Sequence, residues 1–404
     1  MRHIAVVFSL ASYLVLAGCG TGEAPTTDDA TGDETVEVDG VSDTEVVFGT
    51  HSDLTGPIAI WGTGIVNGLR MRFDEANAAG GVHGRQIRLV VEDTQYQVPK
   101  AISAANKLIN RDKVFAFIMA VGTQTNIAAM KQQLPAGVPN LFPGSGARAM
   151  VEPFQELVVS QMGVYYEEIR AGVKYFIEEK GRTTPCAIYH DSDYGIEILD
   201  GARDQAEAMG LTLAATSAHK PTDVEFTAAV LRLREAGCDL VMVGLVHRDT
   251  ILALEAARKM GWEDVDWVGN EAAYGQVIAD QKSGSGEGYY AFVPIPLVYE
   301  DDENLAPEVR DWLVAYRERF GEPPNLPAMV GYRGADLAIR GLELAGRDLT
   351  REGMIAALES MSEYTDLFGN KLTFGPDDHK GVDSSSLSQI QNGRWVTLDT
   401  SITY

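Results

Sequence analysis

The sequence predicts an α/β protein made of two doubly wound halves, each a parallel sheet covered by helices on both faces. Short apolar segments alternate with helical periods in the order β-α-β-α-β-α-β, which is the pattern of such a sheet. The same alternation restarts near residue 186. The composition, with 45% hydrophobic residues, is that of an ordinary globular protein. About 360 residues follow the N-terminal segment, which suggests two domains.

The first half begins with an expected strand at 45–51 and a helix at about 64–79. In that helix Ile65, Leu69 and Phe73 recur at four-residue spacing, and two glycines end it at 80–81. The elements that should follow are a strand at 86–92, a helix at 98–110, a strand at 114–119, a helix at 125–134, and strands at 139–143 and 156–160.

The second half repeats the alternation. Its expected elements are a strand at 186–190, a helix at 196–209, a strand at 211–217, a helix at 223–236, a strand at 238–244, a helix at 251–260 and a strand at 266–269. Later segments must pack onto the two halves: helices at 307–320, 329–345 and 351–360, with closing strands near 372–374 and 387–391.

The N-terminus reads as an export signal. A short basic start, Met1-Arg2-His3, precedes an almost purely apolar run at 4–16, and residues 1–18 end just before Cys19. A run of about 13 residues is shorter than the roughly 20 that span a bilayer and fits a secretory signal peptide. Cleavage between Leu16-Ala17-Gly18 and the cysteine resembles the bacterial lipobox, which implies a lipidated Cys19. An ordinary signal with an incidental cysteine is the alternative.

The segment after the cysteine is acidic and almost without apolar side chains. Residues 20–45 carry nine acidic residues and no Lys or Arg, so residues 19–44 are expected to be a disordered spacer. The formal charge of −25 argues against nucleic acid as a partner and against docking on an anionic membrane surface. No later apolar run reaches spanning length. We therefore expect an exported protein at the periplasmic or extracellular face, held to its membrane by lipid alone.

Cysteine chemistry is sparse. After Cys19 only Cys186 and Cys238 remain, which excludes a disulfide-dense scaffold and a zinc knuckle. Both residues begin strands that should be neighbours, the first and the third of the second half. A disulfide between them is permitted outside the cytoplasm, and two buried free thiols are the alternative.

Enzyme motifs are weak. The glycine-rich stretch 62–68 looks like a dinucleotide loop, but it follows its strand by about ten residues and its third glycine falls one place late. Gly144-Ser145-Gly146 lacks the spacing of a nucleophile elbow, and no His-Glu-x-x-His occurs. We expect no enzyme, no metal site and no cofactor.

The position of a ligand site follows from sheet topology. In open α/β sheets ligands lie beyond the carboxyl ends of the strands, where the strand order reverses. In each half that point comes after the first and third strands. The first half offers residues 53–61 and 120–125, and the second offers 191–195 and 245–249. Two such edges turned toward each other would form a cleft between the halves.

Five stretches carry a family resemblance. They are Leu54-Thr55-Gly56-Pro57-Ile58-Ala59-Ile60-Trp61-Gly62, Asn77-Ala78-Ala79-Gly80-Gly81-Val82-His83-Gly84-Arg85, Glu92-Asp93, His190-Asp191-Ser192-Asp193-Tyr194-Gly195 and Asp378-His379-Lys380-Gly381. In this order and spacing they resemble the leucine/isoleucine/valine-type solute-binding proteins of bacterial ABC importers. The resemblance implies a type I periplasmic-binding fold, in which the chain crosses three times between two lobes. Lobe one would be 45–162 with 293–384, and lobe two 163–292 with 385–404.

The resemblance also implies ligand contacts from lobe one. Trp61 matches an aromatic wall against the ligand's side chain, with a Trp packed only for stability as the alternative. Gly122 and Thr123 open the helix after the third strand, where N–H groups and a hydroxyl hold a carboxylate. Gly144-Ser145-Gly146 matches a second turn that binds the ligand's amine and carboxylate, a plain glycine turn being the alternative.

From lobe two, the resemblance implies that Tyr194 closes on the ligand and that Glu271 pairs with its ammonium group. A solvated loop Glu is the alternative for Glu271. The family usually has an aromatic residue where this chain has Val246, which together with Gly122 leaves a differently shaped pocket. Three tyrosines near the crossovers could refill it: Tyr165, Tyr166 and Tyr274.

The function implied is that of a monomeric solute-binding component. It would capture an amino acid or related small carboxylate by closure of the lobes and deliver it to an ABC permease. Two alternatives stay open. One is a ligand sensor of the same fold that presents its closed form to a receptor or sensor kinase, and the other is a binder of amides or aromatic acids.

Overall fold

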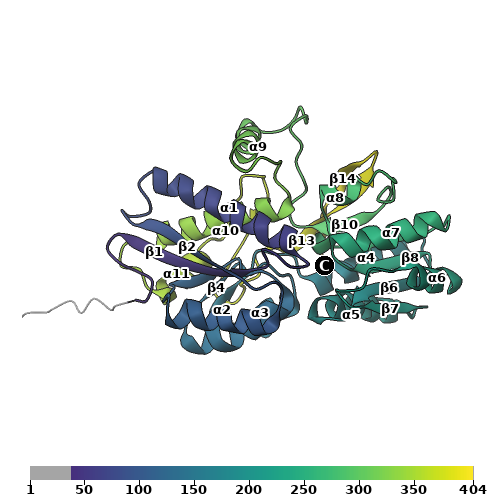
Figure 1. Ribbon diagram of the computed structural model, residues 1–404, viewed down its shortest axis with the longest axis horizontal. Helices are drawn as coiled ribbons and strands as arrows, with labels where there is room; N and C mark the ends of the chain where they lie inside the picture. The colour runs from purple at the N-terminus through teal and green to yellow at the C-terminus, as the bar shows by residue number, and fades with distance from the viewer. Residues whose placement is uncertain (1–37, 404) are drawn as a thin grey trace, which may run out of the picture. The chain divides into compact units, whose positions relative to one another are not determined.

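The structure is a computed structural model and describes residues 38–403, which belong to one compact unit with two large sheets and a small two-stranded one (Figure 1). The first sheet is fully parallel and has the order β2-β1-β3-β4-β5. Its strands are β1 (Glu45–Ser52), β2 (Gln86–Asp93), β3 (Ala116–Ile118), β4 (Asn140–Leu141) and β5 (Val158–Val159). The order reverses between β1 and β3, as the alternation of elements predicts.

Helices cover both faces of the first sheet (Figure 1). They are α1 (Ala59–Ala78), α2 (Val98–Asn110), α3 (Thr123–Gln133), α10 (Leu326–Ala345) and α11 (Arg351–Glu359). Helices α2 and α3 pack together on one face, and α1 packs on α10 on the other. The second contact is close because it uses glycines: a Cβ on Gly68 would lie 2.2 Å from the Ala328 carbonyl oxygen.

The second sheet has seven strands in the order β14-β13-β10-β9-β8-β6-β7. Five are parallel: β6 (Pro185–His190), β7 (Thr216–His219), β8 (Leu240–Gly244), β9 (Asp266–Gly269) and β10 (Tyr290–Val293). Their order, β7-β6-β8-β9-β10, corresponds to the order β2-β1-β3-β4-β5 of the first sheet. The antiparallel strands β13 (Ser384–Gln391) and β14 (Arg394–Thr403) extend the second sheet beyond β10. The helices of this half are α4 (Tyr165–Glu178), α5 (Asp193–Ala208), α6 (Thr227–Glu235), α7 (His247–Lys259) and the short α8 (Gln276–Ala279).

We call the first sheet with α1–α3, α10 and α11 lobe one, and the second sheet with α4–α8 lobe two. The chain passes between them after β5, after β10 and before β13. The remaining elements are α9 (Pro307–Phe320) and a small antiparallel pair, β11 (Tyr364–Thr365) and β12 (Lys371–Leu372).

Several helices begin earlier than the sequence periodicity predicts, among them α1 and α5. Helix α1 begins at Ala59, directly after a turn that Asp53 holds by accepting hydrogen bonds from the backbone N–H groups of Gly56 (2.5 Å) and Ile58 (2.8 Å). Helix α5 begins at Asp193 after an N-cap serine. Trp61 and Tyr194, predicted to lie in loops, therefore lie in the first turns of helices, whose rigid backbones position them.

Other elements also differ from the prediction. Strand β7 lies later than 211–217 and α6 begins later than 223, because Asp223 and Glu225 accept hydrogen bonds from backbone N–H groups in an intervening turn. Helix α4 and strands β10 and β14 were not predicted. The signal for α4 was present, since Ile169, Val173 and Phe176 are buried on one face.

Residues 38–44, predicted to belong to the spacer, pack against lobe one. Val41 forms an isolated β-bridge with Val46, and Arg85 Nε donates to the Ser42 carbonyl (2.6 Å). The backbone of Gly40 packs directly against Phe115, just before β3, since a Cβ on Gly40 would lie 2.1 Å from the Phe115 nitrogen. The predicted signal peptide and Cys19 lie outside the described residues. Within 38–403 no helix has both the length and the apolarity that crossing a bilayer demands.

The two remaining cysteines form a disulfide. Cys186 lies in β6 and Cys238 just before the adjacent strand β8, and their Cα atoms are 5.9 Å apart. The bond therefore links the first and third strands of lobe two.

Candidate ligand-binding site

A small cavity lies between the carboxyl edges of the two sheets. Its volume is about 30 Å³, against roughly 300–1,000 Å³ for ligand pockets in general. The lobes meet across it, because Trp61 Nε1 of lobe one donates to the Ala272 carbonyl of lobe two (3.3 Å). A solute can enter only if these walls move apart. The lining residues are Ile58, Trp61, Tyr96, Val121, Gly122, Thr123, Gly144, Tyr165, Tyr194, Val246 and Ala272.

Three of the segments that form the lobe-one wall contain residues predicted from the sequence, and each follows a strand. Trp61 comes from the first turn of α1, Gly122 and Thr123 from the start of α3, and Gly144 from the loop after β4. The last two segments are joined, since Val121 and Gly144 form a parallel bridge. Ser145 stands just behind the wall, where its hydroxyl hydrogen-bonds with that of Thr123 (2.8 Å). The structure thus brings these sequence-predicted residues together.

Tyr96 is a wall residue that the sequence reasoning missed. Its ring covers Gly122, where a Cβ would lie 2.4 Å from Tyr96 Cε2, and Gly122 has a φ of +98°. Burial and the charges of Asp193 and Asp53 raise the pKa of the Tyr96 hydroxyl, while the Thr123 backbone N–H lowers it. The hydroxyl therefore faces an N–H group expected to hold a ligand carboxylate. The available signal was position, since Tyr96 follows the carboxyl end of β2.

The lobe-two wall is aromatic. Tyr165 and Tyr194 meet edge to face with ring centroids 5.3 Å apart. The Tyr194 hydroxyl donates toward Leu245 O (3.2 Å) and Asn270 Oδ1 (3.1 Å), which holds the ring in place. Val246, at the start of α7, also lines the cavity.

Only one of the three candidate refilling tyrosines lies in the wall. Tyr165 lines the cavity, and its backbone N–H donates to Gly146 O (2.8 Å), which places Gly146 directly behind it. Tyr166 points elsewhere, with its hydroxyl donating to Asp204 (2.8 Å). Tyr274 is 1% exposed and its hydroxyl accepts from Leu297 N (2.9 Å), so it belongs to the core of lobe two.

Glu271 lies beside the cavity but not in its lining. It begins a short 3₁₀ turn (Glu271–Ala273) after β9, is 0% exposed, and neither of its carboxyl oxygens has a donor. Burial raises its pKa well above the ordinary value, and the neighbouring Glu168 carboxyl raises it further. Burial also raises the pKa of Glu168, to about 7, against the lowering effect of the Ser385 hydroxyl. Glu271 thus faces a second carboxyl group rather than a cation.

Charged contacts join the lobes beside the cavity. Arg148 lies in a 3₁₀ turn (Arg148–Met150) soon after the Gly144–Gly146 turn, and its Nε pairs with Glu197 Oε2 of α5 (2.9 Å). Its Nη2 lies 3.3 Å from Asp200 Oδ2, and its guanidinium stands 4.0 Å from the centre of the Tyr166 ring. These contacts hold lobe one against α4 and α5 of lobe two.

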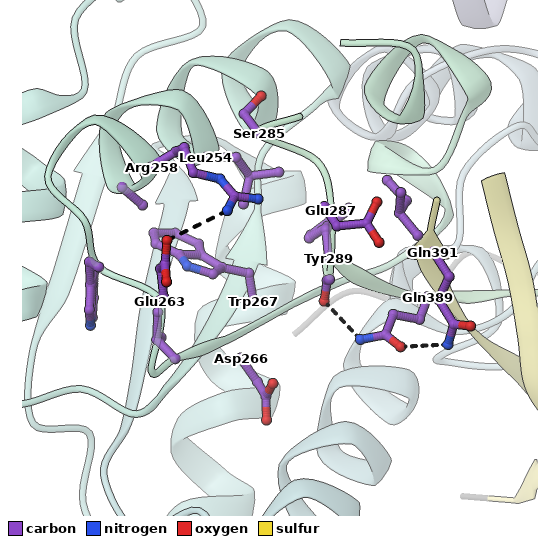
Figure 2. A pocket seen from close by; sticks show the side chains of 15 residues that line it. Leu254, Arg258, Glu263, Asp266, Trp267, Ser285, Glu287, Tyr289, Gln389 and Gln391 are labelled. Atoms are coloured by element: carbon purple, nitrogen blue, oxygen red, sulfur yellow. Dashed lines mark hydrogen bonds and ion pairs between the residues drawn. The ribbon is translucent and has the colours of Figure 1, made fainter. Parts of the chain in front are cut away.

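A second and larger cavity, of about 330 Å³, lies at the amino end of β9 (Figure 2). Trp267, Arg258 and Glu263 line it, and Arg258 Nη1 lies 3.7 Å from Glu263 Oε1. None of the predicted site residues contributes to this cavity. This cavity therefore lies at the amino edge of the second sheet, opposite the carboxyl edge where the small cavity lies. In the described part of the chain, no cluster of three or more His, Cys, Asp or Glu side chains is arranged to hold a metal ion.

Comparison with known proteins agrees with this geometry. The periplasmic binding protein family matches residues 45–394. Leu/Ile/Val-binding protein homolog 8 of Brucella abortus is 24% identical over 366 residues, which cover 88% of this chain and 90% of that protein. Among solved structures, the fatty acid ABC transporter substrate-binding protein from Thermomonospora curvata is similar with a TM-score of 0.81 at 24% identity, covering 90% of this chain and 94% of that one. A solute-binding protein of an ABC transporter from R. palustris, in complex with benzoate, has a TM-score of 0.77 at 20% identity, covering 88% and 96%.

These likenesses confirm the type I periplasmic-binding fold. The family consists of exported proteins that bind small molecules and interact with ABC permeases, and the relatives are solute-binding proteins rather than enzymes. The chain belongs to the periplasmic binding protein family, among relatives of the leucine/isoleucine/valine-binding type.

Proposed function

We propose that this chain is the solute-binding component of an ABC importer and that it captures an amino acid or related small carboxylate between lobes 45–162 with 293–384 and 163–292 with 385–404. One observation carries the proposal. Wall residues from the reversal points of both sheets, Trp61 and Thr123 on one side and Tyr194 on the other, converge on a single cavity. The name of the Brucella abortus relative supports an amino acid as the solute.

Capture would proceed by closure. In an open form, the start of α3 and the Gly144–Gly146 turn present N–H groups and the Thr123 and Ser145 hydroxyls to a carboxylate. Here Tyr96 and Tyr165 cover these groups, so we expect both rings to turn away when the solute binds. Lobe two then brings Tyr194 over the solute. The driving free energy is the solute's differential affinity for the closed form, which the permease would recognise.

A carboxylic acid without an amine, or an amide, is the second candidate solute. No charged side chain lines the cavity, and the Glu271 carboxyl lies against Glu168 rather than toward the lining. The structural neighbours named for a fatty acid and for benzoate support an apolar acid.

A thermal-shift screen with matched pairs of solutes separates the two candidates. Leucine is compared with isocaproate and phenylalanine with hydrocinnamate, each pair differing only by the amine, and simple amides complete the panel. A solute at about 100 times its Kd adds about 2.7 kcal/mol of stability. A shift with amino acids alone supports the first candidate, and a shift with the acids or amides alone supports the second. No shift with any solute refutes both.

Two tryptophan variants test the location of the site. Trp61→Ala should abolish the shift, because its ring forms the cavity wall and contacts lobe two. Trp262→Ala, in the second cavity, is the matched control and should leave the shift unchanged. The reverse pattern would place the site in the second cavity.

We also propose that a lipid on Cys19 tethers the protein to its membrane. The basis is the lipobox-like sequence before Cys19 and the acidic segment after it. Tethering would raise the effective concentration of the binding protein at the permease. Cys19→Ala should release the protein from the membrane fraction into the soluble envelope fraction, and retention of the variant in the membrane would contradict the anchor.

A further inference from the structure

A pair of buried carboxyl groups lies behind the cavity wall, where the chain crosses between the lobes. Glu168 is in the first turn of α4, just after the first crossover, and Glu271 follows β9. Both side chains belong to residues that are 0% exposed. Ser385, which donates to Glu168 Oε1, lies at the start of β13, after the third crossover. The pair therefore lies where the first and third crossovers enter lobe two.

The pair is adjacent to the cavity through its chain neighbours. Tyr165, in the wall, lies one helical turn before Glu168 on the same face of α4. Ala272, also in the wall, directly follows Glu271. The two carboxyl-bearing residues are therefore close neighbours of the cavity wall.

The protein supplies too few donors for two carboxylates. Both oxygens of Glu271 and Oε2 of Glu168 have no hydrogen-bond partner. Ionised carboxyls only accept hydrogen bonds, so two of them in contact can bond only if one retains a proton. Burying two unpaired negative charges side by side is too costly to persist. The geometry therefore calls for one positive charge, a proton or a cation, between the two groups.

The charged side chains around the pair do not supply this positive charge. Glu167 faces the pair from the same helix but is paired with Lys380 Nζ (3.0 Å). The positive charge of Arg333, on α10, lowers the pKa of Glu271 only as a minor effect, and its guanidinium is engaged elsewhere: Nε donates to Gln161 (2.7 Å) and Nη1 lies 3.5 Å from Asp366. The other groups facing the pair, the hydroxyls of Tyr165 and Tyr194, are neutral because burial raises the pKa of each.

We propose that Glu168 and Glu271 share one proton until a solute ammonium group replaces it between them, which makes Glu168 a specificity-determining residue of the site. The inference rests on the proposed function. The exchange is balanced: the proton leaves the carboxyl for solvent, the ammonium keeps all its own protons, and both glutamates end as carboxylates. An acid without an amine has no group to displace the proton.

The exchange has a definite pH dependence. While the pair holds its proton, each bound ammonium releases it, so the affinity for an amino acid should rise up to tenfold per pH unit and level off above the pKa of the pair. The same proton has the opposite effect on folding. A raised pKa stabilises the fold fully below about pH 4.5, the unfolded value, and this contribution is lost as the pH rises through about 7.

The first experiment tests whether the two carboxyl groups share a proton in the protein without solute. Urea unfolding of the wild type from about pH 5 to about pH 8 is compared with the double variant Glu168→Gln/Glu271→Gln, which has no carboxyl at the pair, and with Glu178→Gln, an exposed residue at the end of the same helix. The unfolding equilibrium constant of the wild type should rise with pH by up to tenfold per unit relative to the double variant. The control should follow the wild type. Equal slopes for all three proteins would overturn the shared proton.

Should the double variant not fold, a spectroscopic measurement on the wild type decides the same point. The infrared carbonyl band of a protonated carboxyl should be present at about pH 6 and lost by about pH 9. If Glu168→Gln/Glu271→Gln does fold, this band should be absent from it at about pH 6. Absence of the band at about pH 6 would contradict the shared proton.

The second experiment tests the exchange. Calorimetric titrations with L-leucine and with isocaproate are run in two buffers of different ionisation enthalpy at about pH 6. The wild type should release about one proton per leucine and none with isocaproate. Glu168→Gln, which leaves a single carboxyl for the ammonium group, should bind leucine more weakly relative to isocaproate than the wild type does. Leucine binding without proton release would refute the exchange. No binding of leucine would refute both the exchange and the amino-acid form of the proposed function, while the first experiment still decides the shared proton.

Discussion

The contact between Arg148 and α5 should control how readily the two lobes separate. Arg148 reaches across from lobe one, with its Nε 2.9 Å from Glu197 and its Nη2 3.3 Å from Asp200. Its guanidinium also lies over the Tyr166 ring. The substitution Arg148→Gln removes the charge while keeping most of the length of the side chain.

The magnitude follows from partial burial. The Arg148 side chain is 31% exposed and its two acidic partners are 14% and 24% exposed, so solvent screens the attraction. A partly exposed ion pair contributes up to about 1 kcal/mol, and a guanidinium over a ring about 0.5–1 kcal/mol more. We therefore expect Arg148→Gln to favour separated lobes by about 1–2 kcal/mol, a change of about 5- to 30-fold in the ratio of the two forms.

Small-angle scattering of the protein without solute measures this ratio. The radius of gyration of Arg148→Gln should exceed that of the wild type, and added salt should expand the wild type more than the variant. Arg203→Gln is the matched control, because Arg203 pairs with the same Asp200 but within α5. If Arg148→Gln and Arg203→Gln scatter alike at every salt concentration, the contact does not hold the lobes together.

Three further predictions concern stability. Gly122→Ala should lower the free energy of unfolding by about 1–3 kcal/mol, because the φ of +98° at this position strains an alanine and the added Cβ would meet Tyr96. In a Tyr96→Ala background the loss of stability measured in urea should be smaller. An equal loss in both backgrounds would rule out the clash. Replacing Cys186 and Cys238 by serine opens a link of sequence separation 52 and should cost up to about 4 kcal/mol in the same assay, whereas unchanged stability would contradict the estimate. Burial lowers the pKa of His51 to about 4, so its protonation favours unfolding: stability should fall by up to about 1.4 kcal/mol per pH unit from about pH 6.5 down to about 4. His51→Leu should show a shallower acid limb, and an unchanged limb would contradict this origin.

Elements with a strong local signal were predicted well. The strand at 45–51 and the helix at 307–320 agree with β1 and α9, since both carry apolar periods bounded by turn residues. The start of α1 was placed too late, because the turn held by Asp53, which leads into the helix, precedes the apolar period. The spacer was extended too far, because the packing of residues 38–44 depends on Phe115, a residue distant in sequence.

The site was predicted in part. Trp61, Thr123 and Tyr194 line one cavity because each follows the carboxyl end of a strand, and this placement is a matter of topology. Their contact with a solute stays a prediction. Tyr96 follows the same rule and was overlooked. Glu271 was predicted to pair with the ligand's ammonium group; its carboxyl lies against Glu168 beside the cavity, and that pairing stays a prediction.

The sequence by itself determined the two repeated alternations of strand and helix and the loops at the reversal points, because apolar periodicity and turn residues act over a few neighbours. Only the tertiary structure decided which side chains meet across those loops. Tyr96 covers Gly122, Glu168 lies against Glu271, and Arg148 reaches α5. Each contact depends on the direction of side chains from elements far apart in the chain, and local sequence does not encode that direction.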